Sequence, residues 1–435
     1  MAQRTIARDT RGSRGGRRAV VGVLAAAVLV AACSSNKPSS KSSRASTTTT
    51  SSSSAAAFLG APKAATGEPV KVGVIGDGRL PAADNTIEQQ VAQETFKFLD
   101  GYGGIGGRPV KVYTCETNAD PGKATDCANQ MIQNGVVAVV IGESSVVVNI
   151  WQPLHEAHVP TMLFGVSDQK LLSDTTSTFT LGNPFAVLAE LPIDVAKANN
   201  VKKVAVTAID VPAATSFYEA SGQATAAFKQ AGLDFTLVRI PLTAADVTPQ
   251  MQRIASGGPT LVHVIGAPST CIAVLNGLHA AGFTGPVTLV QQCVDDSTRK
   301  AVPASVLKGI HMSAQAPVGD PNDPGLALYQ KEILPKLTTK NDPGSVAELM
   351  FSSVTAFHVA LQGITGDITP ENVVATIKKM PWTLLPGGGG THFRCNGKAL
   401  AGSPALCIRA GLVTTLDDTG MPTAYKPVGD TRIED

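Results

Sequence analysis

A regular alternation of short apolar runs and amphipathic stretches restricts the fold of this chain more than any other feature. Four runs rich in β-branched residues follow one another: 70–75, 110–114, 135–142 and 159–165. Three stretches with helical spacing of apolar residues separate them: about 85–102, 121–132 and 149–157. The run 135–142, GVVAVVIG, is apolar almost throughout, as a strand buried on both faces of a parallel sheet should be. The alternation predicts an α/β fold with a doubly wound parallel sheet.

The pattern pauses at 177–185 and then restarts, which indicates a second α/β lobe. Four further strands are predicted, with helical stretches between them: 202–209, 234–240, 260–266 and 285–293. The part of the chain after Gly67 is also too long for one ordinary hydrophobic core. We therefore expect two lobes with these bounds: 68–183 with 314–382 for the first, and 184–313 with 383–435 for the second.

The N-terminus has the pattern of an export signal. An arginine-rich start precedes an apolar run from Ala19 to Ala32, which is shorter than the roughly 20 residues that span a bilayer. The run ends in Val-Ala-Ala-Cys at 30–33, which resembles the bacterial lipobox and predicts a signal peptide at 1–32 and a lipid on Cys33. A signal cut after Ala32 without lipidation is the alternative. The pair Arg17-Arg18 leaves the choice between Sec and twin-arginine export open.

The segment that follows Cys33 is rich in serine and threonine. Such a sequence buries too little apolar area to offset the loss of chain entropy on folding. We expect residues 33–67 to form a flexible tether that holds the folded domain away from the membrane surface.

The remaining six cysteines fall into three couples that are close in sequence: Cys115 with Cys127, Cys271 with Cys293, and Cys395 with Cys407. Many pairings are possible for six cysteines, and sequence alone does not choose among them. Disulfides persist outside the cytoplasm, so three local bridges are the simplest interpretation. A zinc site would need CxxC or mixed His/Cys spacing, which the sequence lacks, and we predict no metal site.

Two long stretches resemble a known family. They are FKFLDGYGGIGGRPVKVYTCETNADPGKATDCANQMI at 96–132 and VVAVVIGESSVVVNIWQPLHEAHVPTMLFGVSDQKL at 136–171. Their order of strands, glycine turns and helices resembles the extracellular substrate-binding proteins of branched-chain amino acid ABC transporters, and the resemblance runs from Val70 to about Val428. It implies a type I periplasmic-binding fold, with two lobes joined by three crossovers and a ligand in the cleft. It also implies delivery of that ligand to the permease subunits of an importer.

Candidate ligand-binding residues in the first lobe follow two predicted strands. Ligands of open α/β sheets bind at the carboxyl ends of the strands, where helix N-termini offer free N–H groups. Ser144 and Ser145 follow the run 135–142, and Val166 and Ser167 follow the next. The resemblance implies that Ser144 or Ser145, together with Ser167, binds a ligand carboxylate, and that the Val166 carbonyl accepts from an ammonium. The alternative is that these serines only cap helices.

The second lobe departs from the family pattern. Amino-acid binders of this family usually place an acid after the strand equivalent to 285–293, and here Gln292 stands at the nearest position. Asp210 follows the strand 202–209, and Asp295 lies further along the chain. A buried, unpaired ammonium is costly. Either Asp210 or Asp295 therefore pairs with it, or the ligand is an amide or related compound without an ammonium.

Several other functions are not supported by motifs. Gly101–Gly106 fits GxGxxG by letter but follows a helix and precedes a strand, the reverse of the order in dinucleotide sites. HEAH at 155–158 is shorter than the HExxH zinc motif, and no GxSxG or P-loop occurs. No run of Lys and Arg suits nucleic acid in the exported part of the chain. We expect a monomeric binding protein without catalysis or cofactor. A ligand-sensing receptor and a surface lipoprotein without transport function are the alternatives.

Overall fold

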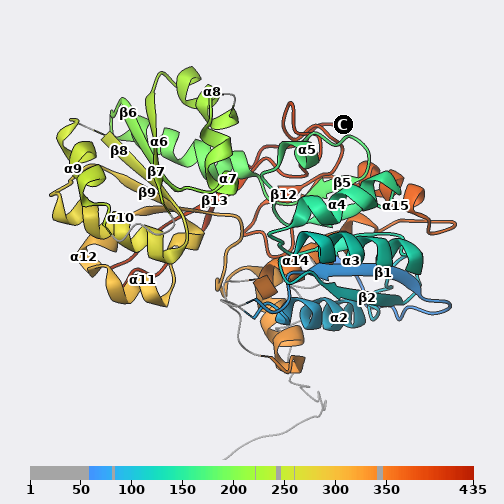
Figure 1. The fold of residues 1–435 in the computed structure, drawn as a ribbon. Coiled ribbons are helices and arrows are strands. Elements are labelled where there is room, and N and C mark those ends of the chain that lie inside the picture. Colours follow the sequence, from blue (N-terminus) through green and yellow to red (C-terminus); the bar gives the residue numbers. More distant parts are fainter. Residues whose placement is uncertain (1–57, 81–83, 221, 242–245, 259, 340–345) are drawn as a thin grey trace, which may run out of the picture. The chain divides into compact units, whose positions relative to one another are not determined.

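The computed structural model describes residues 58–435, apart from 81–83, 221, 242–245, 259 and 340–345. The predicted signal peptide, the lipidation site Cys33 and most of the tether lie outside the described residues. The described chain forms two α/β units, each built on its own parallel sheet (Figure 1).

The first sheet has five parallel strands in the order β2-β1-β3-β4-β5. Their bounds are β1 (Val70–Gly76), β2 (Val110–Glu116), β3 (Val139–Ile141), β4 (Thr161–Leu163) and β5 (Thr178–Thr180). The four predicted strands of the first series are confirmed, and β5 lies in the segment where the predicted pattern pauses. In the register, Gly73 of β1 lies opposite both Tyr113 of β2 and Val139 of β3.

Helices cover both faces of the first sheet because side chains alternate along each strand. On one face, Val74, Val140 and Met162 share a core with α2 (Ile87–Leu99) and α14 (Val346–Ala360). On the other face, Ile75, Ile141 and Leu163 pack with α3 (Pro121–Asn134) and α4 (Val147–Glu156). The further helical segments of this unit are α5 (Gln169–Leu172), α13 (Pro324–Leu328), η4 (Tyr329–Ile333), η5 (Leu334–Lys336) and α15 (Pro370–Lys379). Every residue of α14 is buried, which makes this helix the centre of the first core.

The second sheet has seven strands in the order β14-β13-β10-β9-β8-β6-β7. Their bounds are β6 (Lys203–Ile209), β7 (Asp234–Ile240), β8 (Thr260–Ile265), β9 (Val287–Val290), β10 (His311–Ala314), β13 (Gly411–Thr415) and β14 (Lys426–Val428). Strands β6 to β10 are parallel, whereas β13 and β14 join as an antiparallel hairpin on β10. The predicted second series of strands is confirmed.

The helical segments of the second unit alternate with its strands. They are η1 (Ala186–Glu190), α6 (Leu191–Ala198), α7 (Pro212–Thr215), η2 (Ser216–Tyr218), α8 (Gln223–Gln230), α9 (Thr248–Ser256), α10 (Pro268–Ala280), η3 (Gln291–Cys293), α11 (Asp296–Ala301) and α12 (Ala304–Leu307). Together with the first unit they make the two doubly wound α/β lobes that the sequence predicts.

The C-terminal part of the chain contributes to both cores. Leu385 and Phe393 lie in the first core, although the sequence analysis assigns residues 383–435 to the second lobe. They flank a small antiparallel pair, β11 (Thr383–Leu384) and β12 (His392–Phe393). Leu406 also joins the first unit, where it pairs with Thr180 next to β5. After β12 the chain therefore rejoins the second sheet only at β13. Near the C-terminus, Ile433 again packs in the core of the first unit.

Residues 58–66, which the sequence predicts as part of the tether, pack against the first unit. Phe58 and Leu59 are buried in its core. The backbone N–H of Lys63 donates to Gly101 O at 2.8 Å, and that of Thr66 donates to Gly107 O at 2.8 Å.

The three predicted disulfides are present. Cys115 at the end of β2 is bonded to Cys127 of α3, Cys271 of α10 to Cys293 after β9, and Cys395 to Cys407 beyond β12. The first two tie a helix to the carboxyl end of a strand, and the third closes the 383–410 segment.

The glycine-rich segment Gly101–Gly106 forms a turn between α2 and β2. Gly103, Gly104 and Gly106 have positive φ angles of 96°, 52° and 60°. A Cβ atom at Gly104 would overlap the carbonyl oxygen of Arg108, so this position requires glycine for a tight turn.

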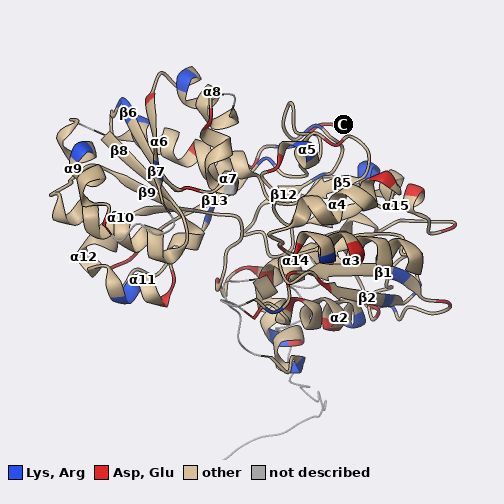
Figure 2. Cartoon of the chain, in the orientation of Figure 1, with Lys and Arg blue, Asp and Glu red and all other residues tan. Residues whose placement is uncertain are grey.

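Charged side chains are spread over the elements of both units (Figure 2). In the part of the chain that the structure describes, no helix has the length and apolar character that crossing a membrane requires. Within the same residues, no group of three or more His, Cys, Asp or Glu side chains is arranged to hold a metal ion.

Candidate functional site

A polar cluster lies at the carboxyl ends of β1, β2 and β3. Asp77 directly follows β1 and is 4% exposed. Its Oδ1 accepts hydrogen bonds from Ser144 Oγ at 2.7 Å and Thr117 Oγ1 at 2.8 Å. Its Oδ2 accepts from Ser145 Oγ at 2.7 Å and from the Ser145 backbone N–H at 2.9 Å. We call Asp77, Thr117, Ser144 and Ser145 the Asp77 cluster.

The topology of the first sheet explains this cluster. β2, β1 and β3 are neighbours and run parallel, so their carboxyl ends meet at one edge of the sheet. Asp77 comes from the central strand, Thr117 follows β2, and Ser144 and Ser145 lie between β3 and α4. The sequence analysis predicted both serines but not Asp77 or Thr117. The signal that could have identified Asp77 is an acid between Gly76 and Gly78 at the end of a buried strand.

A second buried carboxylate lies beneath the same edge. Glu88 of α2 is fully buried, and its Oε1 accepts a hydrogen bond from the Glu143 backbone N–H at 3.2 Å. A Cβ atom at Gly142 would lie 2.5 Å from Glu88 Oε1, and one at Gly76 would lie 2.8 Å from Glu88 Oε2. Glycine at both strand ends therefore makes room for the Glu88 carboxylate under the loop that carries Ser144 and Ser145.

The predicted residues after β4 lie at the next strand end along the same edge. Val166 is 8% exposed and packs in the first unit's core, while Ser167 is half-buried. Asp168 caps α5, since its Oδ1 accepts from the Lys170 backbone N–H at 2.8 Å. The cap of this short helix is thus Asp168, not Ser167.

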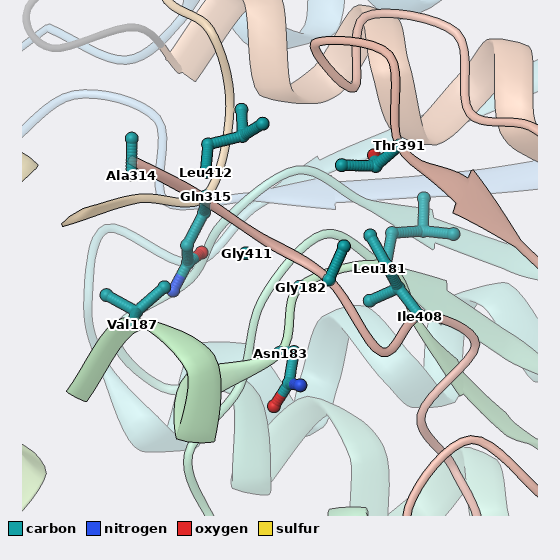
Figure 3. A pocket seen from close by; sticks show the side chains of 11 residues that line it. Leu181, Gly182, Asn183, Val187, Ala314, Gln315, Thr391, Ile408, Gly411 and Leu412 are labelled. Atoms are coloured by element: carbon teal, nitrogen blue, oxygen red, sulfur yellow. The ribbon is translucent and has the colours of Figure 1, made fainter. Parts of the chain in front are cut away.

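Gln315 is a neighbour of this loop that sequence reasoning missed. It directly follows β10, and a Cβ atom at Gly165 would lie only 2.5 Å from its Oε1. Figure 3 shows its amide directed toward Val187 and Gly411, in a space bordered by three stretches of chain that connect the two sheets. This space is too narrow for a water molecule, so it is a packing gap and not a ligand site.

Asp210 lies at the carboxyl end of β6, as predicted, but it already has a partner. Arg239 of β7 donates from Nη1 to Asp210 Oδ1 at 2.7 Å and from Nη2 to Glu219. These hydrogen bonds raise the pKa of Arg239 further above its ordinary value. One guanidinium thus faces two carboxylates, and the charge of Asp210 is already compensated.

Gln292 lies in the short 3₁₀ turn after β9 and is exposed. Asp295, the other acid considered for this lobe, caps α11 through hydrogen bonds from Ser297 Oγ at 2.6 Å and the Thr298 backbone N–H at 2.9 Å. Burial acts to raise the pKa of Asp295, but these hydrogen bonds outweigh it and lower the pKa. Gln292 and Asp210 lie at the carboxyl ends of β9 and β6, with β8 between them in the sheet.

The sequence of this chain matches the model of a known protein family. A family model described as periplasmic binding protein matches residues 69–408, more than three quarters of the chain. The chain belongs to the periplasmic binding protein family. The family resemblance predicted from the sequence is therefore confirmed, and membership implies a binding protein that acts outside the cytoplasm. A search of curated proteins found no match.

Solved structures of this family have the same fold. An extracellular ligand-binding receptor from Verminephrobacter eiseniae is 17% identical, with a TM-score of 0.63 over 82% of this chain and 100% of its own. A putative branched-chain amino acid ABC transporter protein from Rhodospirillum rubrum is 16% identical, with a TM-score of 0.65 over 82% and 100%. A leucine-binding protein from Thermotoga maritima is 16% identical, with a TM-score of 0.62 over 83% and 99%. At this level of identity the likeness shows the type I periplasmic-binding fold alone.

Proposed function

We propose that this protein is an extracytoplasmic solute-binding lipoprotein, which captures a small polar ligand in a cleft between its lobes and delivers it to the permease subunits of an ABC importer. It acts as a monomer and catalyses no reaction. The observation that carries the proposal is the Asp77 cluster, a set of polar side chains from three strand ends at the edge where α/β proteins bind ligands.

Amino acids and their derivatives are the first ligand class to test. The Thermotoga maritima neighbour is a leucine-binding protein, and the Rhodospirillum rubrum neighbour is named for branched-chain amino acid transport. A thermal-shift screen of residues 58–435 against amino acids, amides, polyols and aromatic acids tests the proposal. A ligand at 100 times its dissociation constant should stabilise the protein by about 2.7 kcal/mol through mass action. A screen without any stabilising compound would contradict ligand capture.

Ser167 and Gln292 are the predicted contacts whose side chains have no role in the hydrogen bonds described above. With the Val166 carbonyl, Ser167 is proposed to hold one end of the ligand, and Gln292 with Asp210 to face the other. Removal of one hydrogen bond to a charged group should weaken binding by roughly 1.5–3 kcal/mol, about ten- to a hundredfold. We expect this loss for Ser167→Ala by calorimetry, whereas Ser256→Ala on the exposed face of α9 should bind like the parent. Equal affinity of Ser167→Ala and the parent would remove Ser167 from the site.

Anchoring through a lipid on Cys33 is part of the same proposal. It rests on the Val-Ala-Ala-Cys sequence at 30–33, which lies outside the described residues. Cys33→Ala should move the protein from the membrane fraction to the soluble fraction, while Ser34→Ala should leave it in the membrane. Membrane retention of Cys33→Ala would contradict lipid anchoring without affecting the ligand-binding proposal.

A further inference from the structure

The hydroxyl protons of the Asp77 cluster are already used. A serine or threonine hydroxyl has one proton to donate and two lone pairs that accept. Thr117, Ser144 and Ser145 all donate that proton to Asp77. The serine oxygens therefore retain only acceptor capacity for any further partner, as long as Asp77 carries its negative charge.

Three backbone donors of the same loop are used as well. A helix N-terminus after a strand is a common anion site, because its first N–H groups are free. Here the Glu143 N–H donates to Glu88, the Ser145 N–H to Asp77, and the Val146 N–H to Ser144 Oγ at 3.3 Å. Two carboxylates of the protein thus occupy the Glu143 and Ser145 N–H groups, which flank the Ser144 hydroxyl in front of α4.

Negative charge near the serine loop also disfavours a ligand carboxylate at this position. Asp77 is 4% exposed and Glu88 is fully buried, and both carboxylates lie directly beneath the serine loop. None of the ion pairs among the described residues joins a lysine or arginine to Asp77. A ligand carboxylate placed against Ser144 and Ser145 would lie beside the like charge of buried Asp77, which is unfavourable.

We propose that Asp77 determines the specificity of this site, by making Ser144 and Ser145 accept hydrogen bonds from a donor group of the ligand. The ligand class is therefore one with an ammonium, amide N–H or hydroxyl at this edge, and any carboxylate it carries binds elsewhere. This inference rests on the proposed function, because it concerns the same ligand site. It reverses the role that the family resemblance implies for Ser144 and Ser145. Asp77 acts through the serines and does not itself touch the ligand.

Three matched probes separate the two roles: L-leucine, L-leucinamide, which lacks the carboxylate, and 4-methylpentanoate, which lacks the ammonium. The parent protein, as residues 58–435, should bind leucinamide with an affinity within about threefold of that for leucine. It should bind 4-methylpentanoate about a hundredfold more weakly than leucinamide, and we call this ratio of the two affinities the gap. Asp77→Asn removes the charge and lets one serine donate. This variant should narrow the gap between leucinamide and 4-methylpentanoate at least about tenfold. Asp126→Asn, an exposed acid on α3, is the control for the charge change and should leave the gap unchanged.

Ser145→Ala is the second variant, in case Asp77→Asn fails to fold. It removes one acceptor, so it should weaken leucinamide about five- to tenfold and leave 4-methylpentanoate unaffected. Three results would overturn this inference but leave the proposed function intact. They are a parent that requires the ligand carboxylate for binding, an Asp77→Asn variant with an unchanged gap, or a Ser145→Ala variant with weaker affinity for 4-methylpentanoate only. If the parent binds none of the probes and no compound of the thermal-shift screen, the proposed function fails, and this inference fails with it.

Discussion

Hydroxyl and amide donors surround the buried carboxylates of Asp77 and Asp174. Asp174 is the clearest example besides Asp77. Its Oδ1 accepts from Thr176 N and Oγ1 at 2.7 and 2.6 Å, and its Oδ2 accepts from Thr178 Oγ1 at 2.5 Å. Thr178 in turn accepts from Trp151 Nε1 at 2.7 Å, which links the turn before β5 to α4. Burial acts to raise the pKa of Asp174, but these hydrogen bonds outweigh it and lower the pKa to about 2.

The lowered pKa of Asp174 predicts a defined acid sensitivity. Because the folded-state pKa lies below the unfolded value, the ionised group stabilises the fold above about pH 4, and this contribution is lost as the pH falls toward 2. Asp174→Asn should therefore reduce the free energy of unfolding by roughly 2 kcal/mol at pH 7. Urea unfolding should show that this difference from the parent shrinks between pH 4 and pH 2.5. A variant as stable as the parent at pH 7 would contradict the assignment, and exposed Asp126→Asn is the control.

Two buried histidines predict a second acid transition at higher pH. His263 of β8 is fully buried and its Nδ1 lies 2.8 Å from Thr288 Oγ1. Burial lowers the pKa of His263 to about 3, and burial lowers that of His358 to about 4. Both are neutral in the folded state, so only the unfolded chain takes up protons as the pH falls below 6.5. Stability is thus complete above this pH and decreases below it.

The expected decrease for each of these histidines is about 1.4 kcal/mol per pH unit below pH 6. His263→Asn keeps a side-chain nitrogen near Thr288 and removes the titrating group. In urea unfolding, this variant should lose less stability than the parent between pH 7 and pH 5, by about 2 kcal/mol in total. Exposed His279→Asn should keep the parent slope. If His263→Asn and the parent have the same slope, His263 is not the buried neutral group described here.

At the scale of elements, the loop after β4 and the segment after β10 depend on each other. Gly165 leaves the space that the Gln315 amide occupies, although the two residues are 150 positions apart. Gly182, which follows β5, borders the same amide, and a Cβ atom there would lie 3.3 Å from Gln315 Oε1. The position of the loop that carries Val166 and Ser167 thus depends on Gln315, which lies in a segment that connects the two sheets.

A compensating pair of substitutions tests this contact. Gly165→Ala should destabilise the protein by up to about 1 kcal/mol, because the new methyl group overlaps Gln315 Oε1 and the glutamine side chain must move away. Gln315→Ala in the same chain removes the overlap and should restore at least half of the lost stability. Gly122→Ala, at an exposed position in the first turn of α3, is the control and should cost little stability. Additive losses in urea unfolding for the double variant would show that the two residues do not share this space.

Most elements were predictable because their signals are local. Strands β1 to β4 and β6 to β9 follow from apolar β-branched runs, and the disulfides follow from close cysteine couples. Contacts between distant residues leave no such signal. Nothing in the sequence around Ser144 indicates that its hydroxyl donates a hydrogen bond to Asp77, which lies 67 residues earlier in the chain. Strands β11 and β12 are too short to show an alternation of apolar residues, so the sequence did not indicate that 383–410 packs in the first core. Because Leu385 and Phe393 are buried in that core, we infer that this segment belongs to the first lobe.

At the scale of the whole molecule, the N-terminal limit of the folded domain differs from what composition predicts. The Ser/Thr-rich run ends at Ser54, and the sequence analysis placed the end of the tether at 67. The structure has Phe58 and Leu59 buried in the first core, and Phe58 O accepts a hydrogen bond from Gln362 Nε2 at 2.8 Å. We infer that the tether ends before Phe58, so that two apolar residues join the end of a polar segment to the domain.

This boundary predicts that residues 58–66 contribute to stability. Burial of a Phe or Leu side chain is worth about 1.5–3 kcal/mol each, and ordering nine residues offsets part of that sum. A chain that begins at 68 should therefore unfold with roughly 2 kcal/mol less free energy than one that begins at 57. Phe58→Ala in the longer chain should lower the free energy of unfolding by a similar amount. If the substitution releases residues 58–66 from the domain, the loss equals the free energy with which this segment packs on the domain and cannot exceed it. Exposed Lys63→Ala should match the parent. Equal stability of the two chain lengths in urea would mean that Phe58 and Leu59 do not hold the segment on the domain.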